Sequence, residues 1–590
     1  MIDARFDDLS PGTERSFRLV EPVGVLEARR PDEVAATIEA AGAAAARGLW
    51  AAGYVAFDAA PGLDTDLVVR ERPGGDAFDA LPLAWFALFE DRQDVPALEP
   101  VALEPPSAPS PWRPSVERPV YDDAIARIRE LIVAGQTYQV NHTLRMRARL
   151  AGDERGFYRD LVLAQRGGFG AYLNLGRYRV LSASPELFFR RDGDRVTTRP
   201  MKGTIARGRW LSEDEAAAER LVSSDKDRAE NAMIVDLVRN DLGRVAVPGS
   251  VRVSRMFDAE RYETVWQLTS TVEGELRPGT SLVEVFRALF PSGSVTGAPK
   301  IRTMRIIRDL EDSPRGVYCG AIGYLAPAGS GEPNANFSVA IRTVVVDSST
   351  GAAEYGVGGG ITFDSSAAGE YEEVLAKARV LTSARPAFDL FETVRHQPGE
   401  GPRHLAEHLE RLGNSARYFG FRCEPETAFA AMKRAAADRG DAFAVRLTLS
   451  RDGSVATEVR ELPPVPDRPI RLALDDEPVD PNDLWLFHKT TRRQPYERRK
   501  EKRPDVDDVI LVNTRGEVTE STIANLAVRH GGEWVTPPLD AGVLAGTYRT
   551  VLLRDGTLTE RAIRISELQA AEEVALVSSV RGWRPAEIVP

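Results

Sequence analysis

The sequence has little of what marks secreted, membrane or nucleic-acid-binding proteins. Its two cysteines, Cys319 and Cys423, are expected in different domains, which excludes a disulfide framework and favours a reducing compartment. No apolar run approaches the length of a membrane span, and the acidic N-terminus has no apolar core and is unlike a secretory signal. The net charge of −12 lacks the basic excess that phosphate binding needs. These absences predict a soluble, cytoplasmic protein with neither nucleic acid nor membrane as partner.

The chain is long enough to form more than one hydrophobic core, because 590 residues normally divide into several domains. A proline-dense stretch from Pro96 to Pro119 is predicted to be a loop. A helix pattern ends near Thr382–Pro386 and a strand pattern begins at Phe388, so a domain boundary is predicted between residues 385 and 386. Other predicted elements are helices around Val34–Arg47, from Tyr121 and over Leu405–Ala416, and strands at Arg179–Leu181, Leu187–Arg190, Val339–Val346, Val445–Leu449, Val509–Val512 and Val574–Val577.

Acidic residues recur in pairs at helical spacing. Asp227 and Glu230 are three apart, as are Glu370 and Glu373, and Lys377 follows four residues later. Residues three or four apart share one helix face. Two acidic faces that meet repel each other unless a cation lies between them, and Mg²⁺ is the usual cation for oxygen ligands. For any single pair, a solvated helix face is the simpler interpretation.

Glycine-rich segments form a second pattern. They are GVGGGITF (Gly356–Phe363), RPMKGT and SGSVTGAPK. Glycine allows backbone amides to approach an anion closely. Ordinary turns explain such runs equally well, so the glycines alone do not decide between the two.

Taken together, the segments between Tyr121 and Leu381 resemble the chorismate-utilising enzymes, and within them component I of aminodeoxychorismate synthases. The segments are GQTYQVN, SASPELFF, TRPMKGT, AENAMIVDLVRNDLGRV, FPSGSVTGAPK, YCGAIGY, VAIRT, GVGGGIT and EYEEVLAKA. The resemblance implies a β-sandwich core with outer helices over residues 1–385, with a variable N-terminal part (1–118) and a catalytic core (119–385). It makes the chain a multidomain protein of the α+β and α/β classes.

The resemblance also implies roles for residues. The implied Mg²⁺ ligands are Glu230 and Glu373, with Asp227 and Glu370 close by. The residues implied around chorismate are Gln139, Thr204, Tyr318, Arg342, Gly358, Gly360 and Lys377. Arg342 suits a two-pronged grip on a carboxylate that a lysine could not reproduce. Glu186 would act as general acid on the departing C4 hydroxyl, which requires a carboxyl that stays protonated near neutral pH.

Two positions discriminate between branches of that family. Relatives that add water carry a lysine at the position of Gln139, so glutamine resembles the amine-adding members. Anthranilate synthases carry a small residue at the position of Lys202, whereas in aminodeoxychorismate synthases this lysine attacks C2 of the ring and is later expelled when ammonia adds at C4. Such covalent catalysis needs a neutral amine. Gln267 departs from the histidine that is common in the family, and glutamine cannot shuttle a proton at neutral pH.

The second half contains a lysine in a strongly basic stretch. Lys489 lies in WLFHKTTRRQPYE, after a predicted strand, and a basic run follows it that could simply be solvated. The segments FETVR, HLERLGNSARYFG, VTESTIANL, TPPLDAGVLAGTYR and SSVRG resemble, in order, the class IV (fold-type IV) enzymes that use pyridoxal 5′-phosphate (PLP). This resemblance covers nearly all of residues 386–590 and implies a fold of two subdomains.

By that resemblance Lys489 holds PLP and then transfers protons, and Glu520 pairs with the pyridine nitrogen. Arg411, Gly546 and Thr547 would bind the phosphate, the last two at a predicted helix start. Ser521, Thr522 and Asn525 lie beside the same site, and Arg581 is a candidate for a substrate carboxylate. Class IV sites resemble sites completed at a dimer interface, so a homodimer through this half is expected.

The two resemblances together predict a bifunctional enzyme of 4-aminobenzoate and folate biosynthesis. The first half would aminate chorismate to 4-amino-4-deoxychorismate, and the second would release pyruvate from it. No glutaminase nucleophile segment was recognised, so a separate glutamine amidotransferase subunit is expected to supply ammonia. Two alternatives stay open. One is an anthranilate synthase component I joined to a D- or branched-chain amino-acid transaminase, since motifs around Lys489 separate lyase from transaminase poorly. The other makes one half a non-catalytic docking or regulatory module.

Overall fold

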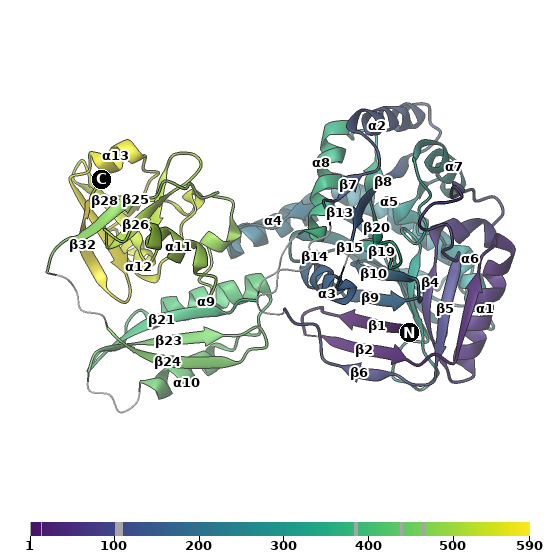
Figure 1. Cartoon of the computed structure of the whole chain (residues 1–590), viewed down its shortest axis with the longest axis horizontal. Coiled ribbons are helices and arrows are strands. Elements are labelled where there is room, and N and C mark those ends of the chain that lie inside the picture. The colour runs from purple at the N-terminus through teal and green to yellow at the C-terminus, as the bar shows by residue number, and fades with distance from the viewer. Residues whose placement is uncertain are drawn as a thin grey trace. The chain divides into compact units, whose positions relative to one another are not determined.

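The computed structural model describes residues 2–12, 14–100, 110–150, 152–382, 387–436, 441–462 and 467–590. The predicted boundary at 385/386 and residues 101–109 of the predicted loop lie outside these ranges. The chain divides into two compact units (Figure 1), one of Met1–Ala206 with Ala218–Pro386 and the other of Arg207–Ala217 with Ala387–Pro590. Within the described ranges no helix is long and apolar enough to cross a membrane.

The first unit is built on two large, mainly antiparallel sheets. In spatial order the first sheet contains β16 (Gly297–Ala298), β8 (Gln139–Arg149), β20 (Ala352–Ile361), β19 (Thr343–Asp347), β10 (Tyr178–Ser184), β9 (Phe169–Asn174), β1 (Asp3–Asp8), β2 (Arg15–Val20) and β6 (Gln93–Val95), with β7 (Arg113–Pro114) on β8. The second contains β13 (Met201–Ala206), β15 (Val265–Glu275), β12 (Arg195–Arg199), β11 (Leu187–Asp192), β18 (Ala335–Val339), β17 (Ala321–Leu325), β4 (Trp50–Val55), β5 (Ala84–Phe89) and β3 (Gly24–Ala28), with β14 (Arg252–Arg261) on β15.

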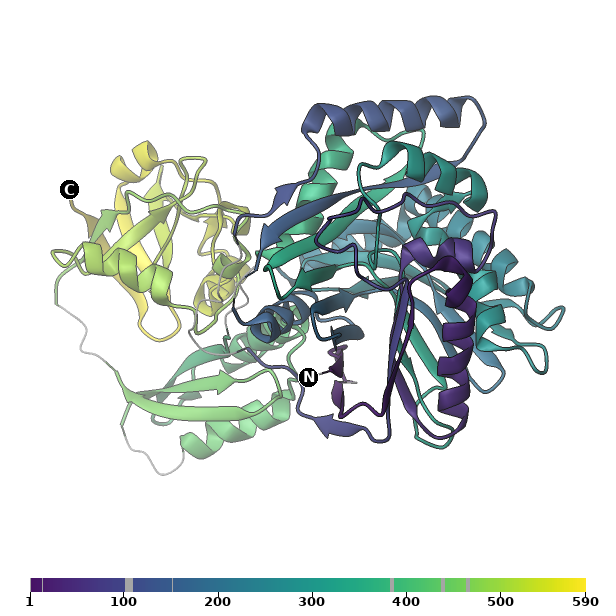
Figure 2. The same cartoon turned by 45° about the vertical axis from the view of Figure 1, so that its right-hand side comes forward.

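Three apolar cores arrange these sheets as a sandwich with helices outside. One core lies between the sheets and includes an aromatic cluster in which the Phe17 and Tyr324 ring centroids are 5.2 Å apart. A second joins one sheet to α1, α5 and α6, and Figure 2 shows α1 beside the strands β4 and β5. The third joins the other sheet to α2, α3, α7 and α8. The helices are α1 (Pro31–Ala46), α2 (Arg118–Val133), α3 (Glu154–Gln165), α4 (Leu211–Ser223), α5 (Asp225–Gly243), α6 (Leu282–Leu289), α7 (Lys300–Leu310) and α8 (Ala367–Ala378). The predicted sandwich with outer helices is therefore confirmed.

One predicted strand of this unit is wrong in a way that matters for the site. The pattern over Val339–Val346 predicts one strand, but the chain leaves β18 in one sheet and enters β19 in the other. Between them Arg342 takes a left-handed backbone conformation with φ of 53°, which lets the chain turn from sheet to sheet. Both strands are apolar because both face cores, so periodicity alone could not reveal the break.

The second unit contains two subdomains, as predicted. The smaller has β22 (Gly401–Pro402), β21 (Leu390–Gln397), β23 (Phe443–Leu449) and β24 (Val455–Glu461), with α9 (Leu405–Phe419) and α10 (Pro425–Ala435) beside them (Figure 1). The larger has β27 (Val518–Ser521), β26 (Asp508–Val512), β25 (Ile470–Leu474), β32 (Gly582–Ile588), β31 (Glu573–Ser578), β28 (Asn525–His530), β29 (Glu533–Thr536) and β30 (Thr559–Glu560). An additional pairing of β27 with β28 closes this sheet into a barrel.

The helices of the larger subdomain are α11 (Gln494–Lys502), α12 (Thr547–Arg554) and α13 (Ile565–Gln569). The predicted strand before Lys489 is wrong, because a 3₁₀ turn (Leu484–Leu486) precedes this residue. Asp483 caps that turn by accepting a hydrogen bond from the backbone N–H of Trp485, and an aspartate in this position favours a turn over a strand.

Candidate active sites

The first unit contains a cavity of about 260 Å³. It draws side chains from β13, β20, α5 and α8, which are far apart in the sequence. The predicted residues that line it are Glu186, Lys202, Thr204, Asp227, Glu230, Tyr318, Arg342, Gly358, Gly360, Glu370, Glu373 and Lys377. The structure thus brings together in one cavity the residues that the sequence singled out in separate segments.

Gln139 does not line the cavity itself, but its carboxamide lies beside Gly360, which does. Its side chain is fully buried, and neither atom of its carboxamide has a hydrogen-bond partner among the described residues. A Cβ placed on Gly360 would lie 2.4 Å from the Gln139 Nε2 and 2.4 Å from the Lys202 Nζ. The amide and the amine therefore converge on the α-carbon of Gly360. A buried, unpartnered carboxamide is costly, so this arrangement suits a ligand that supplies the missing hydrogen bonds.

Glu186 has the environment that a general acid needs. Its side chain is buried, and burial raises its pKa to about 7, against the lowering effect of a 2.6 Å hydrogen bond that the Ser294 hydroxyl donates to Oε1. A substantial fraction of this carboxyl is therefore protonated at neutral pH. Ser294 is a further site residue, and it lies in the glycine-containing segment SGSVTGAPK. Gln267 lines the same cavity and accepts a 3.0 Å hydrogen bond from the Thr204 hydroxyl.

The predicted metal ligands face the cavity but are partly engaged by lysines. Lys202 Nζ lies 3.5 Å from Glu230 Oε2, and Lys377 Nζ lies 2.7 Å from Glu373 Oε1. In the described part of the chain, no three acidic, histidine or cysteine side chains are grouped closely enough to hold a metal ion. Mg²⁺ usually takes only one or two protein carboxylates and completes its shell with water and substrate oxygens. The oxygen donors of Glu230 and Glu373 fit that requirement, and the metal-binding role of these residues stays a prediction.

The glycine run of β20 is a strand, and its glycines make room for neighbours. A Cβ on Gly356 would lie 2.1 Å from the ring of Tyr318, and one on Gly358 would lie 2.2 Å from the carbonyl oxygen of His142. Packing therefore requires glycine at these two positions independently of any anion. The carbonyl of Gly358 also accepts a 2.8 Å hydrogen bond from Lys377.

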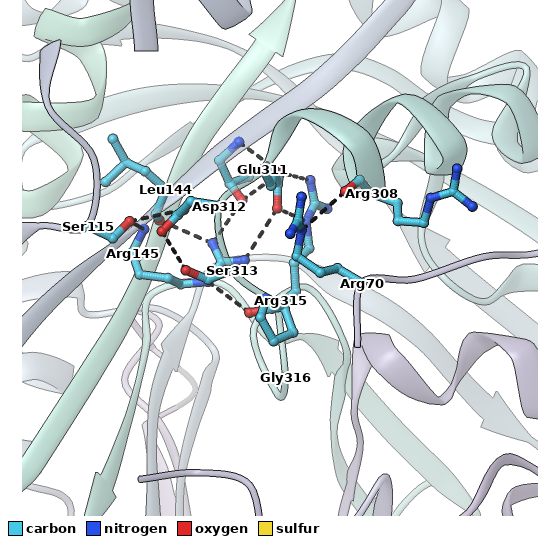
Figure 3. A network of polar contacts seen from close by, with 12 residues as sticks. Arg70, Ser115, Leu144, Arg145, Arg308, Glu311, Asp312, Ser313, Arg315 and Gly316 are labelled. Atoms are coloured by element: carbon cyan, nitrogen blue, oxygen red, sulfur yellow. Dashed lines mark hydrogen bonds and ion pairs between the residues drawn. The ribbon is translucent and has the colours of Figure 1, made fainter. Parts of the chain in front are cut away.

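Glu311, Arg315 and Arg145 form a buried network of charges (Figure 3). Glu311 accepts hydrogen bonds from Arg315 at 2.6 Å and from Arg145 at 3.3 Å. Arg315 also donates to the carbonyl oxygens of Asn141 and Val295, at 2.7 and 2.6 Å, and both of these residues line the cavity. Burial alone would raise the pKa of Glu311, but the two arginines hold it below its usual range. The network therefore fixes the backbone of the cavity at Asn141 and Val295.

The second unit contains a larger cavity, of about 540 Å³. The predicted residues that line it are Arg411, Lys489, Glu520, Ser521, Thr522, Asn525, Gly546, Thr547 and Arg581. Six further basic residues also line it although none of them is predicted as a site residue, and they are Arg446, Arg460, Arg492, Arg493, Lys500 and Arg584. The cavity is therefore strongly basic and suited to anionic groups.

Lys489 and Glu520 both have perturbed protonation in this cavity. Burial, and then the charge of Arg411, lower the pKa of the Lys489 amine to about 8, and its Nζ lies 4.9 Å from the centre of the Phe391 ring. Burial raises the pKa of Glu520 to about 8. Asn525 donates a 2.9 Å hydrogen bond to Glu520. The lysine thus reaches its nucleophilic neutral form more readily than a solvated lysine does.

Arg411 is held by a cluster that the sequence reasoning missed. It donates to Glu392 at 2.8 and 2.6 Å and to the carbonyl oxygen of Ala545 at 3.0 Å. The ring of His408 lies 2.6 Å from Glu392 and 2.7 Å from the Ser579 hydroxyl. Burial would raise the pKa of Glu392, but Arg411 and His408 keep it at about 2. Glu392 and His408 were visible in the motifs FETVR and HLERLGNSARYFG, but neither motif indicated that they would meet.

The residues of this cavity fit PLP. A Cβ on Gly546 would lie 1.7 Å from the Asn525 Oδ1, so only glycine leaves this approach open. Gly546 precedes the first turn of α12, as the sequence predicted, and helix N-termini favour phosphate. The cavity also has a partly neutral lysine for the aldehyde of the cofactor, a basic lining for its phosphate and a buried acid for its pyridine nitrogen.

Comparisons with known proteins agree with this division. The model of the chorismate binding enzyme family matches residues 12–383, and the model of the amino-transferase class IV family matches residues 389–589. A class IV aminotransferase domain implies PLP. The solved anthranilate synthase component I of Streptococcus pneumoniae is 27% identical, with a TM-score of 0.54, covering 63% of this chain and 93% of that one.

Two curated relatives are similar to part of the chain. Aminodeoxychorismate synthase of Streptomyces griseus is 45% identical over 289 residues, which are 48% of this chain and 38% of the relative. Anthranilate synthase component 1 of Aquifex aeolicus is 40% identical over 264 residues, which are 45% of this chain and 52% of the relative. The chain thus spans about half the length of these relatives or less. Since the family model covers most of its length, the chain belongs to the chorismate binding enzymes and continues into a class IV aminotransferase domain.

Proposed function

We propose that this chain is a bifunctional enzyme that converts chorismate to 4-aminobenzoate. Residues 1–385 would aminate chorismate to 4-amino-4-deoxychorismate, and residues 386–590 would release pyruvate from that product. The observation that carries this proposal is the meeting of the Lys202 amine and the Gln139 carboxamide at Gly360, beside a carboxyl whose pKa is about 7. These are the residues expected of an enzyme that forms a covalent bond to C2 and adds an amine at C4.

In the first reaction, Lys202 attacks C2 while Glu186 protonates the C4 hydroxyl, which leaves as water. Ammonia then adds at C4 and expels the lysine, so the amine ends free again. Before Mg²⁺ binds, the carboxylate of Glu230, 3.5 Å from the Lys202 Nζ, can take the proton that this amine must lose and pass it to water. Arg342 and Lys377 would bind the carboxylates of the substrate. Mg²⁺, held by Glu230 and Glu373, would neutralise charge at the ring carboxylate.

In the second reaction, PLP held at Lys489 would supply an electron sink for breaking bonds at the carbon that carries the amine. Lys489 would move the proton, since a pKa of about 8 suits a base that must both take and return it. Arg411 and the N-terminus of α12 would bind the phosphate, and Glu520 would bind the pyridine nitrogen. Arg581 would bind a carboxylate of the substrate. Elimination of pyruvate leaves an aromatic ring, which drives the reaction forward.

The proposal includes two partners. The name component 1 of the Aquifex relative supports a separate glutamine amidotransferase subunit that supplies ammonia. A homodimer through the second unit is expected from the class IV resemblance. Sedimentation of the purified chain with PLP tests the dimer, and glutamine-dependent turnover with an added amidotransferase subunit tests the other partner.

Product identification tests the function directly. The purified chain is incubated with chorismate, ammonium, Mg²⁺ and PLP, and the products are separated by chromatography. We expect 4-aminobenzoate and pyruvate in equal amounts, without a 2-oxo acid being added. Anthranilate as the aromatic product would overturn the first assignment, and dependence on a 2-oxo acid acceptor would overturn the second in favour of a transaminase.

A further inference from the structure

A short segment from within the sequence of the first unit belongs to the second compact unit. Arg207–Ala217 follows β13, which carries Lys202, and precedes α5, which carries Asp227 and Glu230. It nevertheless groups with residues 387–590. The contacts that place it there are specific and largely buried, and they lead to the neighbour of Lys489.

The segment begins with a tight turn that only glycine permits. A Cβ on Gly208 would lie 2.2 Å from the backbone nitrogen of Asp214. The buried Asp214 carboxylate accepts hydrogen bonds from the Arg207 Nε at 2.6 Å and from the Gly208 N–H at 3.0 Å. Arg207 donates to the carbonyl oxygen of Tyr418 at 2.8 Å, and the Tyr418 hydroxyl donates to the carbonyl oxygen of Gly208 at 2.7 Å. This reciprocal pair fixes the turn against α9.

The next residues attach the segment to the loop before Lys489. The Trp210 and Phe487 rings lie with their centroids 5.1 Å apart. The guanidinium of Arg209 donates to Asp540 at 2.8 Å and to the carbonyl oxygen of Pro481 at 3.2 Å. A tryptophan contact combined with an arginine anchor is the kind of contact that carries most of the free energy of an interface.

The segment also determines the hydrogen bonding of His488. The His488 Nε2 lies 3.0 Å from the carbonyl oxygen of Arg209, and the Nδ1 lies 3.0 Å from the Ser415 hydroxyl. Because a carbonyl only accepts, Nε2 must carry the hydrogen. Burial lowers the pKa of His488 to about 3, so the ring is neutral and Nδ1 accepts from Ser415. Both ring nitrogens are therefore satisfied, one of them by the segment.

We propose that Arg207–Ala217 is a working part of the PLP site, in which the Arg209 carbonyl fixes His488 and thereby positions Lys489. This inference rests on the proposed function, since it assumes that Lys489 holds PLP. His488 and Arg209 are positioning residues, because each is proposed to act through Lys489 and not on the reacting atoms. A lysine whose backbone is held less firmly would present its amine less accurately to the cofactor and to the substrate carbon.

The test uses the full chain and three variants, His488→Leu, His488→Gln and Arg209→Ala/Trp210→Ala. His488→Leu leaves the Arg209 carbonyl and the Ser415 hydroxyl without their partner, whereas the amide of His488→Gln can still donate to Arg209. Arg498→Ala is the matched control, because Arg498 forms an exposed ion pair with Glu477 in the same unit. PLP uptake, the pH titration of the visible absorbance of bound PLP, and pyruvate release from 4-amino-4-deoxychorismate are measured for each.

We expect His488→Leu and the double variant to shift the pH titration of the bound cofactor by about one unit. Their kcat for pyruvate release should fall about 10- to 100-fold, as for the loss of a buried hydrogen bond at a site that needs accurate placement, with little change in KM. His488→Gln should recover most of this loss, and Arg498→Ala should resemble the unaltered chain. The amination of chorismate serves as an internal measure of folding.

Two outcomes would contradict the inference and are distinguishable. If the unaltered chain takes up PLP, and both His488→Leu and the double variant keep its titration and kcat, the segment does not position Lys489. If the unaltered chain takes up no PLP at all, the proposed function of the second unit fails and this inference fails with it. Should the double variant not fold, the comparison of His488→Leu with His488→Gln still decides.

Discussion

In the first unit Lys202 lies among carboxylates, whereas in the second unit Lys489 shares its cavity with arginines. Lys202 has Glu230 3.5 Å from its amine, and the same cavity contains Glu186, Glu370 and Glu373. Lys489 is buried, and Arg411 adds to the effect of burial by lowering its pKa to about 8. Both lysines are proposed to form covalent bonds, yet the charged groups around them are of opposite sign.

The difference shows two ways of obtaining a nucleophilic amine. Lys202 has the carboxylate of Glu230 3.5 Å from its amine, and this group can take its proton. Desolvation and like charge instead weaken the charged form of Lys489 before any substrate arrives. The first route suits a lysine that binds covalently once in each turnover and is expelled. The second suits a lysine that holds a cofactor throughout.

The largest expected effect comes from removing each lysine separately. Lys202→Ala should lower amination of chorismate by about 1,000-fold or more, because covalent catalysis at C2 is lost, while pyruvate release from added 4-amino-4-deoxychorismate continues. Lys489→Ala should abolish pyruvate release but leave amination of chorismate unchanged, so that 4-amino-4-deoxychorismate accumulates. Chromatography of the two variants alone and mixed is the measurement. Formation of 4-aminobenzoate at the parent rate by either variant alone would contradict the role given to its lysine.

A smaller effect is expected from Glu186→Gln, which cannot donate a carboxyl proton. Amination should fall about 100-fold or more. The sign of the pH dependence follows from burial, which raises the pKa of Glu186 to about 7. Because the acid must be protonated, kcat/KM for chorismate should be high below pH 7 and fall as the pH rises through it. This alkaline limb should disappear in Glu186→Gln. A profile that is the same in both proteins would assign the ionisation to another group.

The smallest of these effects is expected from Gly360→Ala. Its new Cβ would lie 2.4 Å from both the Gln139 Nε2 and the Lys202 Nζ, so the two side chains must move apart. We expect amination to fall about 10-fold or more, as when reacting groups are displaced by a fraction of an ångström, with pyruvate release unchanged. Gly42→Ala in α1 is the matched control, because its Cβ would meet only Leu282, at 3.7 Å. Equal rates for both variants would show that the convergence at Gly360 is unimportant.

Sequence motifs predicted the site residues better than apolar periodicity predicted the helices and strands. Lys202, Glu186 and Lys489 belong to segments whose order is distinctive, and the structure places each in a cavity with its predicted neighbours. The break at Arg342 was missed because two apolar strands in different sheets look like one strand in sequence. Arg446 and Arg493 carry no such signal, because an arginine in a cavity and one at the surface have the same sequence pattern. Their place depends on contacts between distant segments.

The membership of Arg207–Ala217 in the second unit limits how this chain can be divided. A gene cut at the boundary between the two halves would yield a second fragment without the turn at Gly208, the Trp210 contact and the acceptor for His488. A fragment of residues 218–386 joined to residues 1–206 would likewise lack the link between β13 and the rest of α4. The two halves are therefore not independent consecutive domains, because the second unit includes a segment that lies within the sequence of the first.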